Sequence, residues 1–372
     1  MRLLRSSRLF LRLPSLWRAY RGGGHLESDE EHLRRAAAWL LAAQRAAGGG
    51  GYAHSYHLAT GWEPPYPETT GYIMPSLRRL GAKLNSAALG ASVAAAHRWL
   101  TTIQEPEGNF RDLAGRAQVF DTGQILIGLN DIVEHGPESS GRPALIRAAT
   151  WLTSVQEQDG SFVTFAYGGR PHAYYARVGA ALLTAGRVAD DEHFRQAGLK
   201  NLDWTLTQQE PNGFFRNLSF ADEPPFLHTM MYVIEGLLDG YAETGQERFL
   251  VSARRFADRL REVAEARDGL LRSQYHFDYS VANPEKCLTG LAQWAAIAFR
   301  FAHLLGDSRW RTEGKKSLDF VKRQQIFSAD PALNGGIFGS APIHGRYMRF
   351  TVPNWGVKFF VDALLEQSRA AP

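Results

Sequence analysis

The densest group of side chains that could carry chemistry lies in the segment Arg-Pro-His-Ala-Tyr-Tyr-Ala-Arg, residues 170–177. Tyr174 and Arg177 are three residues apart and would share one face of a helix that begins there. An arginine that binds a substrate carboxylate, beside a tyrosine or histidine that moves a proton, suits proton abstraction from the carbon next to that carboxylate. We therefore predict that Tyr174 and His172 are catalytic and that Arg177 and Tyr175 bind substrate. The alternative is a stacked Tyr–Arg pair that only holds the loop.

Two carboxylates, Glu68 and Asp121, stand at the starts of predicted helices. Asp121 with Gln124 matches a capping-box pattern, so helix capping is the structural alternative for Asp121. A carboxylate at a helix N-terminus has its charged form favoured. We therefore predict that both act catalytically as a base, a nucleophile or a hydroxyl-binding group rather than as a proton donor.

Further polar and aromatic residues precede other apolar helical segments, where one cavity could collect them. Residues 275–279 alternate like a strand, which makes Tyr279 a catalytic candidate or a loop anchor. Aromatic faces for sugar rings, with arginine and histidine for carboxylates, describe a saccharide site. The remaining predicted substrate-binding residues are Tyr66, Gln124, His228, Arg346, Asn354 and Trp355.

One set of residues could bind a metal. Glu285, Cys287 and His344 offer a carboxylate, a thiolate and an imidazole, which zinc accepts. The alternative is a buried, inert cysteine at the start of a helix. We expect no cofactor, with zinc at these three residues as the exception.

A sequence repeat identifies the elements that position these residues. An aromatic residue is followed five residues later by glutamine at Trp39, Trp99, Trp151, Trp204 and Phe320, and Phe256 begins a degenerate copy with arginine in place of glutamine. The copies recur about every fifty to sixty residues, and most lead into a turn with glycine and then an aromatic residue. This pattern predicts a helix that ends in a tight turn.

Between successive copies lies a second, more apolar helix. These six segments have few charges, as expected of helices that are covered on most faces: residues 72–80, 124–133, 175–188, 229–238, 288–305 and 355–365. The alternating helices, such as residues 143–156 and 249–264, carry charges on one side and are predicted to be the outer ones.

Six outer/inner helix pairs bury their apolar faces by closing on themselves or by stacking as an open solenoid. We predict closure, an all-α (α/α)6 toroid over residues 30–372 as a single domain. Connections after outer helices are long and those after inner helices are short. The long loops and the N-termini of the inner helices should therefore gather at one end.

The composition limits the function classes. The 372 residues carry a net charge of +4, and much of that excess lies in an arginine-rich, acid-free leader, which argues against a nucleic-acid groove. One cysteine allows no intrachain disulfide and fits a reducing, cytoplasmic compartment. Residues 1–29 have no apolar run long enough for a signal peptide or a membrane span, and are predicted to be a basic amphipathic helix on the inner membrane surface or a disordered leader.

The repeat resembles that of terpene cyclases, squalene-hopene cyclases and protein prenyltransferase β subunits, and the number of helix pairs is similar to that of six-hairpin glycosidases and uronate-acting enzymes. Segments such as residues 66–73, 119–124 and 170–175 resemble those of uncharacterised bacterial proteins found with polysaccharide-assembly enzymes. A class II terpene cyclase would need Asp-x-Asp-Asp, whereas Val188-Ala-Asp-Asp191 lacks the first aspartate. A prenyltransferase would need the zinc set, in which Glu285 replaces aspartate.

The leading hypothesis is a carbohydrate-active enzyme of polysaccharide or glycan metabolism. Its substrate would be a glycan that contains uronic acid, and its reaction a C5 epimerisation, a lyase β-elimination or a glycoside hydrolysis. The alternatives are an enzyme of the terpenoid cyclase or prenyltransferase type and a non-catalytic glycan-binding component of a polysaccharide-assembly complex.

Overall fold

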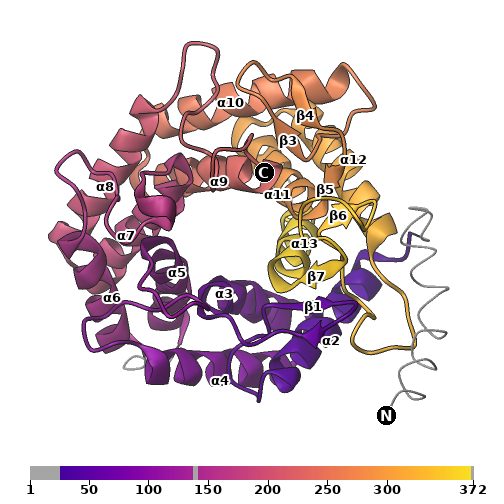
Figure 1. Cartoon of the computed structure of the whole chain (residues 1–372), viewed down its shortest axis with the longest axis horizontal. Helices are drawn as coiled ribbons and strands as arrows, with labels where there is room; N and C mark the ends of the chain where they lie inside the picture. Colours follow the sequence, from indigo (N-terminus) through magenta and orange to yellow (C-terminus); the bar gives the residue numbers. More distant parts are fainter. Residues whose placement is uncertain (1–25, 137–140, 370–372) are drawn as a thin grey trace. The chain divides into compact units, whose positions relative to one another are not determined.

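The computed structural model describes residues 26–136 and 141–369 (Figure 1). These residues form twelve α-helices, α2 to α13, with a few short strands. They fall into two compact units. The first unit comprises the described parts of Met1–Pro65, Ser76–Ser92 and Pro284–Pro372, and the second comprises Tyr66–Pro75 and the described parts of Val93–Asn283. The prediction of one domain over residues 30–372 stays a prediction, and most of the leader lies outside the described residues.

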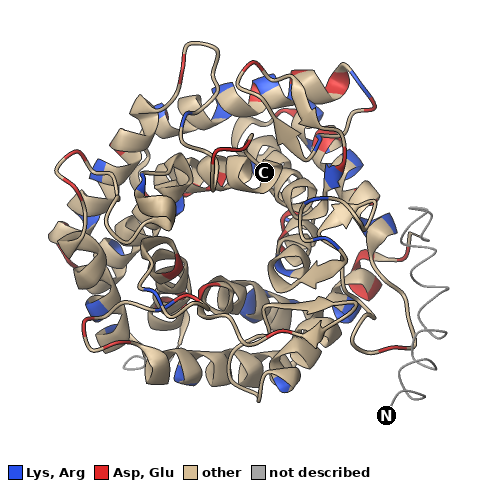
Figure 2. Cartoon of the chain, viewed as in Figure 1, with Lys and Arg blue, Asp and Glu red and all other residues tan. Residues whose placement is uncertain are grey.

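The second unit is built from helical hairpins. Its three most apolar helices are α5 (Val119–His135), α7 (Ala176–Ala189) and α9 (Leu227–Thr244). They pack side by side in chain order, and each also packs against one more polar helix, in turn α6 (Arg142–Ser154), α8 (Glu192–Thr207) and α10 (Glu247–Glu265). The charges of this unit lie mostly on the polar helices and on the loops (Figure 2).

The first unit repeats the same pairing. Apolar α11 (Leu288–Leu305) packs against polar α12 (Ser308–Gln324), and apolar α13 (Asn354–Gln367) packs against α11 and against α2 (Asp29–Ala46). Two helices, α3 (Pro67–Leu84) and α4 (Ala87–Ile103), have residues in both units. All six predicted apolar helices are thus confirmed.

Short strands occur only in the long connections of the described chain. In the first unit, β1 (Ser55–His57) pairs with β2 (Gly61–Trp62) and β7 (Thr351–Pro353), and β5 (Lys286–Cys287) pairs with β6 (Ser340–Ala341). In the second unit, β3 (Gln274–Tyr275) pairs with β4 (Val281–Asn283). The connections after polar helices are long and those after apolar helices are short, as predicted.

The glutamine of the repeat has the same structural role in every intact copy. Its side-chain amide donates to the carbonyl of the glycine in its own turn and to a carbonyl of the next polar helix. Gln156, for example, bonds to Gly160 at 3.2 Å and to Ala197 at 2.9 Å. The same pair of bonds is made by Gln44, Gln104, Gln209 and Gln325. Gln325 of the last copy bonds to His32 of α2, so the last copy pairs with the first within the first unit.

The turn glycine is required by space and by backbone conformation. Gly160 has a φ of +94°, and a Cβ atom there would lie 2.3 Å from the carbonyl oxygen of Lys200. At Gly108, a Cβ atom would likewise lie 2.2 Å from the carbonyl oxygen of Arg147. Contacts this short exclude every side chain, so the repeat needs glycine to seat each turn against the next polar helix.

We expect Gln325→Ala to destabilise the protein by about 2–4 kcal/mol, because the buried carbonyls of His32 and Gly335 would lose their donor. Gln325 is buried and its Oε1 atom also contacts His32 Nδ1 at 2.6 Å. The measurement is urea unfolding followed by circular dichroism. The half-exposed Gln104 is the matched control, since water can replace its bonds, and equal losses for Gln104→Ala and Gln325→Ala would contradict this account.

A Thr-Gly pair stands near the start of three apolar helices, at Thr70-Gly71, Thr122-Gly123 and Thr289-Gly290, and the first two show why glycine is there. A Cβ atom on Gly71 would lie 2.4 Å from the Cα of Ile125, and one on Gly123 would lie 2.7 Å from a methyl group of Val178. The glycines let α3, α5 and α7 approach closely. Close helix packing is therefore the explanation at these two positions.

The predicted strand at residues 275–279 is wrong after its first residue. β3 ends at Tyr275, and a tight turn follows in which Asp278 accepts from the backbone N–H of Ser280 at 2.9 Å. Tyr279 has a φ of +65°, which ends any strand alternation. The sequence signal failed because an aspartate-centred turn can present the same alternation of aromatic and polar residues.

Candidate functional site

Asp121 is the centre of a buried hydrogen-bond network in the second unit. It lies in the first turn of α5 and is fully buried. The hydroxyl of Tyr66, just before α3, donates to Oδ2 at 3.1 Å, and the hydroxyl of Tyr167 donates to Oδ1 at 2.5 Å. The two hydroxyl oxygens are 3.1 Å apart. Three separate segments thus bring their reactive groups to one carboxylate.

Glu68 is the second carboxylate of this network. It lies in the first turn of α3 and is buried. Burial, followed by the nearby charge of Asp121, raises the pKa of Glu68 well above its ordinary value, against a hydrogen bond with Tyr66 and the charge of Arg177. Burial also raises the pKa of Asp121 to about 7, against the hydrogen bonds from Tyr167 and Tyr66.

The prediction that both carboxylates favour the charged form is therefore corrected. The positive end of a helix lowers the pKa of a carboxyl group by a modest amount, whereas full burial can raise it by several units. Both carboxyl groups therefore favour the protonated form more strongly than an ordinary carboxyl group does. Both can donate a proton, which the sequence argument had excluded.

The hydrogens of the network can be assigned from its chemistry. Tyr66 has one hydroxyl hydrogen, which it donates to Asp121, so its oxygen is left to accept. The carboxyl group of Glu68 is a second hydrogen-bond partner of the Tyr66 hydroxyl, in a bond that lowers the pKa of Glu68. The result is a chain from Glu68 through Tyr66 to Asp121, with Tyr167 donating from the other side. A proton can pass between the two carboxyl groups through the Tyr66 hydroxyl.

The capping-box prediction for Asp121 is wrong. The residue at the N-cap of α5 is Gln118, and its side chain makes no capping bond. Gln124 bonds elsewhere, its Oε1 accepting from Arg177 Nε at 2.8 Å. The carboxylate of Asp121 accepts from two tyrosines and also bonds with the backbone N–H of Asp121 itself.

The predicted 170–177 cluster packs next to this network as an aromatic wall. The ring of Phe120 lies 5.2 Å from Tyr174 and 5.4 Å from Tyr175, and His172 lies 4.7 Å from Tyr174. Burial raises the pKa of Tyr174 well above its ordinary value, so its hydroxyl stays protonated. A protonated tyrosine can still donate a proton, so the assignment of Tyr174 as catalytic stays a prediction.

His172 supports the loop that carries Tyr167. Its Nε2 atom lies 2.7 Å from the carbonyl oxygen of Tyr167, which makes Nε2 the protonated nitrogen. Burial lowers the pKa of His172, against the bond to that carbonyl, so the ring is neutral. His172 thereby holds the short 3₁₀ turn Tyr167–Gly169 in place beside Asp121.

Arg177 is bound inside the protein rather than presented to a substrate. It is buried, and its Nη1 atom pairs with Glu235 of α9 at 2.5 Å. It also borders a second cavity of about 260 Å³, whose other lining residues include Asp239 and Glu243. An arginine whose charge is met by a buried carboxylate, at an acidic cavity, is poorly placed to bind a substrate carboxylate.

The other predicted residues lie in three places. His228 packs against Tyr232 in the second unit, with ring centroids 4.3 Å apart. Tyr279 packs against Phe214 and Phe256, so the structure does not bring it to Asp121. The first unit contains the remainder, which is Arg346, Asn354 and Trp355. There, Asn354 donates to the carbonyl of Ala53 at 2.9 Å and Trp355 donates to the hydroxyl of Tyr347 at 2.7 Å.

The proposed zinc residues do not assemble. Within residues 26–136 and 141–369, no three or more His, Cys, Asp or Glu side chains are grouped to hold a metal ion. Cys287 is buried and accepts from the backbone N–H of Gly290 at 3.4 Å. Glu285 accepts from the backbone N–H of Arg346 at 2.8 Å.

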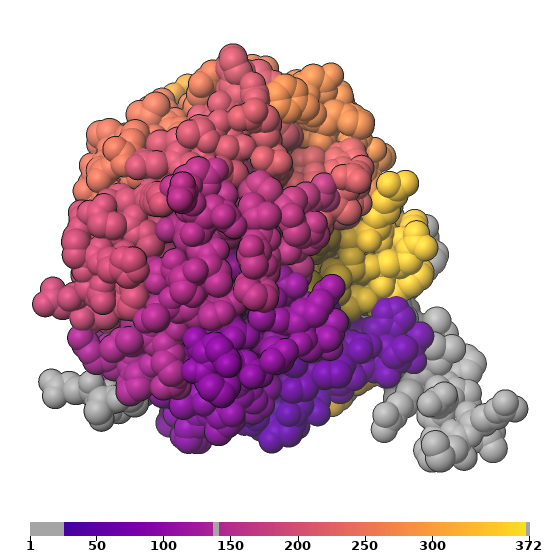
Figure 3. Space-filling model, turned by 60° about the vertical axis from the view of Figure 1, so that its left-hand side comes forward, coloured from indigo at the N-terminus to yellow at the C-terminus, as the bar shows by residue number. Residues whose placement is uncertain are grey.

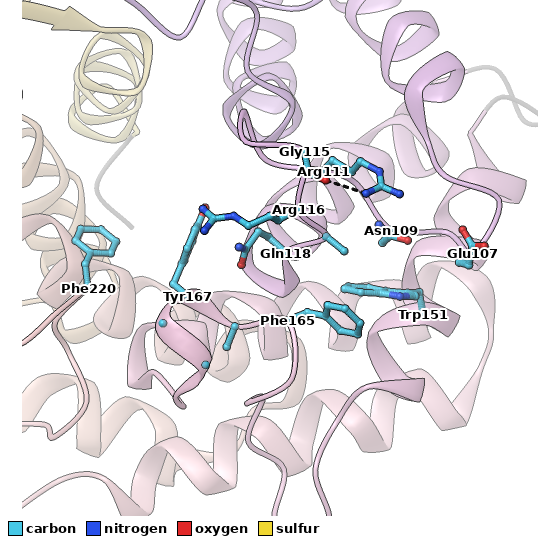
Figure 4. Close-up of a pocket in the computed structure, with 14 residues that line it drawn as sticks. Glu107, Asn109, Arg111, Gly115, Arg116, Gln118, Trp151, Phe165, Tyr167 and Phe220 are labelled. Atoms are coloured by element: carbon cyan, nitrogen blue, oxygen red, sulfur yellow. Dashed lines mark hydrogen bonds between the residues drawn. The ribbon is translucent and has the colours of Figure 1, made fainter.

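A cavity of about 970 Å³ opens beside the network (Figure 4). Tyr167 lies in its wall, so the cavity reaches the carboxylates through one hydroxyl. The other residues that line it include Glu107, Asn109, Arg111, Arg116, Gln118, Trp151, Phe165 and Phe220. Tyr167 was not among the predicted site residues. The glycines that follow it are typical of an irregular, exposed turn and could have indicated it.

The pKa of Asp121 predicts a pH-dependent stability. Folding raises its pKa from about 4 to about 7, so between these values the folded state keeps a proton that the unfolded state has lost. Stability from this group therefore falls as pH rises through that window. Between pH 4 and pH 7, we expect the free energy of unfolding of Asp121→Asn to rise by about 1–4 kcal/mol relative to that of the natural protein.

Paired urea titrations across this pH range measure the effect. Buried histidines with a lowered pKa, such as His54 and His172, make each protein more stable as the pH rises, which is opposite to the effect of Asp121. They are present in both proteins and cancel in the difference. Parallel stability curves for the two proteins would contradict the raised pKa.

Comparisons with known proteins identify the architecture. Residues 60–234 match the family model of the squalene-hopene cyclase C-terminal domain. No curated protein matches the sequence. No helix among the described residues is long and apolar enough to cross a membrane.

Three solved structures illustrate the structural similarity. An unsaturated glucuronyl hydrolase specific for heparin is 14% identical, with 91% of this chain and 96% of that chain covered and a TM-score of 0.72. The cellobiose 2-epimerase of Bacillus thermoamylovorans B4167 is 11% identical, covering 90% and 98%, with a TM-score of 0.69. A D-mannose isomerase is 12% identical, covering 91% and 96%, with a TM-score of 0.72. The chain therefore has the (α/α)6 toroid fold of the six-hairpin proteins, as its repeat predicted.

Proposed function

We propose that this protein is a carbohydrate-active enzyme that acts by acid–base catalysis on a glycan containing uronic acid. The observation that carries the proposal is the buried pair of carboxylic acids, Glu68 and Asp121, joined through Tyr66 and reaching an open cavity through Tyr167. Buried carboxyl groups with raised pKa values are the equipment of a general acid–base enzyme, and the pKa of Asp121 is raised to about 7.

The roles follow from which groups can meet a substrate. Asp121 is fully buried, whereas Tyr167 lines the cavity and Tyr66 is partly exposed. The hydroxyls of the two tyrosines would therefore contact the sugar, and Asp121 would supply or accept the proton that passes through them. Glu68 would reset the network through Tyr66 after each turnover.

The structural relatives support a sugar as the substrate. A glucuronyl hydrolase specific for heparin, a cellobiose 2-epimerase and a D-mannose isomerase share the fold, and each is named for a sugar or a glycan. The fold alone supports several chemistries, so the polar cavity with its arginines, amides and aromatic rings is the more direct support.

The test is incubation with hyaluronan, alginate and polygalacturonate in deuterated water, followed by NMR and absorbance. Deuterium gained at C5 without cleavage identifies an epimerase. Absorbance of an unsaturated uronate identifies a lyase, and new reducing ends alone identify a hydrolase. Binding with no chemical change would favour a glycan-binding component, and no response with any polymer would overturn the proposal.

A second candidate is a terpenoid cyclase, favoured by the squalene-hopene cyclase match and by the aromatic rings around Asp121. The segment that resembles the cyclase acid supports it less, because Asp191 caps α8 by accepting from the backbone N–H of His193. Incubation with squalene and with geranylgeranyl diphosphate tests this candidate. A cyclic product would replace the glycan proposal.

A further inference from the structure

The cavity beside Tyr167 is larger than one proton transfer needs. Its volume of about 970 Å³ is at the upper end of the range for ligand sites and exceeds the space of a single sugar ring. The outer helices and loops of the second unit form one continuous surface, magenta to rose in Figure 3. The lining residues 107–118, 151, 165–169 and 220 all belong to this unit.

An aromatic platform stands at one side of this cavity. Phe165 is 45% exposed and lies beside Trp151, with ring centroids 5.6 Å apart (Figure 4). Its φ of +61° is a backbone conformation that residues other than glycine rarely adopt. Residues in rarely populated backbone conformations cluster at active sites and ligand sites, so the conformation of Phe165 supports a binding role for its ring.

A buried acceptor faces the same cavity. Gln118 lines it and is only 5% exposed, and among the described atoms its Oε1 has no hydrogen-bond partner. An unpaired buried carbonyl oxygen is costly unless a ligand or water supplies a donor. A sugar hydroxyl is such a donor, whereas a carboxylate is not. Gln118 therefore favours a hydroxyl-rich ligand.

The charged groups of the cavity fit a saccharide as well. Arg116 is paired with Asp112 at 2.8 Å but its side chain is 68% exposed, so donors remain on its outer side. In Figure 4 its guanidinium extends toward Tyr167. Arg111, paired with Glu105, lies toward Trp151 and Asn109. Arginine–carboxylate pairs at the rim offer both donors and acceptors to sugar hydroxyls and to a uronate group.

We propose that this cavity, which we call the platform subsite (Trp151, Phe165, Gln118 and Arg116), binds the sugar unit next to the one that reacts. This inference rests on the proposed function and narrows its substrate class to oligosaccharides and polysaccharides. One ring lies on Phe165, one of its hydroxyls donates to Gln118, and the linked ring reaches Tyr167. Free monosaccharides are therefore poor ligands.

The experiment is equilibrium binding of tetrasaccharides from hyaluronan, alginate and polygalacturonate, measured by calorimetry in the Asp121→Asn background, where we expect turnover to be strongly slowed. We expect at least one tetrasaccharide to bind more tightly than its monosaccharide. Phe165→Ala and Gln118→Leu should each weaken that binding by about tenfold, whereas Phe165→Tyr, which keeps the ring, should not. Monosaccharide affinity should be the same in all of these variants.

Phe277→Ala is the matched control, because Phe277 is 49% exposed and lies outside the cavity. Unchanged tetrasaccharide affinity in Phe165→Ala, or no preference for tetrasaccharide over monosaccharide, would overturn the platform subsite. Turnover by the natural protein decides the proposed function separately. Tetrasaccharide binding that depends on Phe165 but leads to no reaction would support the subsite and reject the catalysis.

Discussion

Asp121→Asn should lower turnover of the glycan substrate by about 10²–10⁴-fold, because this range is the usual contribution of one general acid or base. Asparagine keeps the size of the side chain and one oxygen that can accept from Tyr66 or Tyr167, yet it cannot take up or release a proton. Steady-state kinetics on the reactive polymer provide the measurement. The loss should appear in kcat, with little change in KM, since Asp121 does not line the cavity.

Tyr167→Phe tests whether the proton exchanged with Asp121 passes through the hydroxyl of Tyr167. It keeps the ring in the cavity wall and removes only the hydroxyl that donates to Asp121 at 2.5 Å. If protons pass through this hydroxyl, Tyr167→Phe should lose activity to a similar extent. The double variant should be little worse than either single one, because both interrupt the same path.

Asp131→Asn is the control on the same helix. Asp131 is buried in α5 but lies beside His135 and the smaller second cavity, away from the tyrosines. It should keep full activity. Folded Asp121→Asn protein that retains more than about a tenth of natural turnover would remove Asp121 from the mechanism.

The fold could be predicted in detail because its signals are local and repeated. Each glutamine is five residues after an aromatic residue, and each turn glycine follows at short range, so the six hairpins are visible without any tertiary information. The bonds that explain these residues, such as Gln156 to Ala197, join neighbouring polar helices. The same residues thus recur in the sequence because every copy makes the same contacts.

The candidate site could be predicted only in part. Glu68, Asp121 and Tyr66 were found because each stands at the start of an apolar helix, and adjacent helices bring such starts together. Their protonation could not be predicted, because it depends on how completely other segments bury them. Tyr167 was missed because an irregular turn has no periodicity that reveals where its side chain lies.

Arg177 shows a different reason for failure. Tyr174 lies in the 3₁₀ turn Ala173–Tyr175 just before α7 and not on the helix, and the partner that decides the role of Arg177, Glu235, is 58 residues away on α9. Glu235 is a charged residue among apolar residues in the middle of α9. A carboxylate in such a helix is a signal for a buried cation, and pairing the two residues by that rule would have corrected the prediction.

Glu235→Ala should therefore destabilise the protein by about 3–5 kcal/mol, because it leaves the Arg177 guanidinium buried without its partner. Arg177 also bonds to Gln124 and lies over the rings of Tyr232 and Tyr72, none of which is charged, and the charge of Asp239 acts on it only from a distance. Urea unfolding measures the loss. Asp203→Ala is the control, since its pair with Arg248 is about half exposed and is worth less than about 1 kcal/mol.

Removal of both partners distinguishes a structural pair from a substrate-binding arginine. If the pair is structural, Glu235→Leu combined with Arg177→Met should recover much of the stability that either single change loses, because the buried charge is gone. If Arg177 instead binds a substrate carboxylate, Glu235→Ala should free it and tighten the binding of glucuronate. We expect no such tightening, because the acidic groups Asp239 and Glu243 of the adjoining cavity would still repel a carboxylate. Carboxylate recognition is thus expected at Arg116, on the exposed side of the network, and not at the arginine that the sequence favoured.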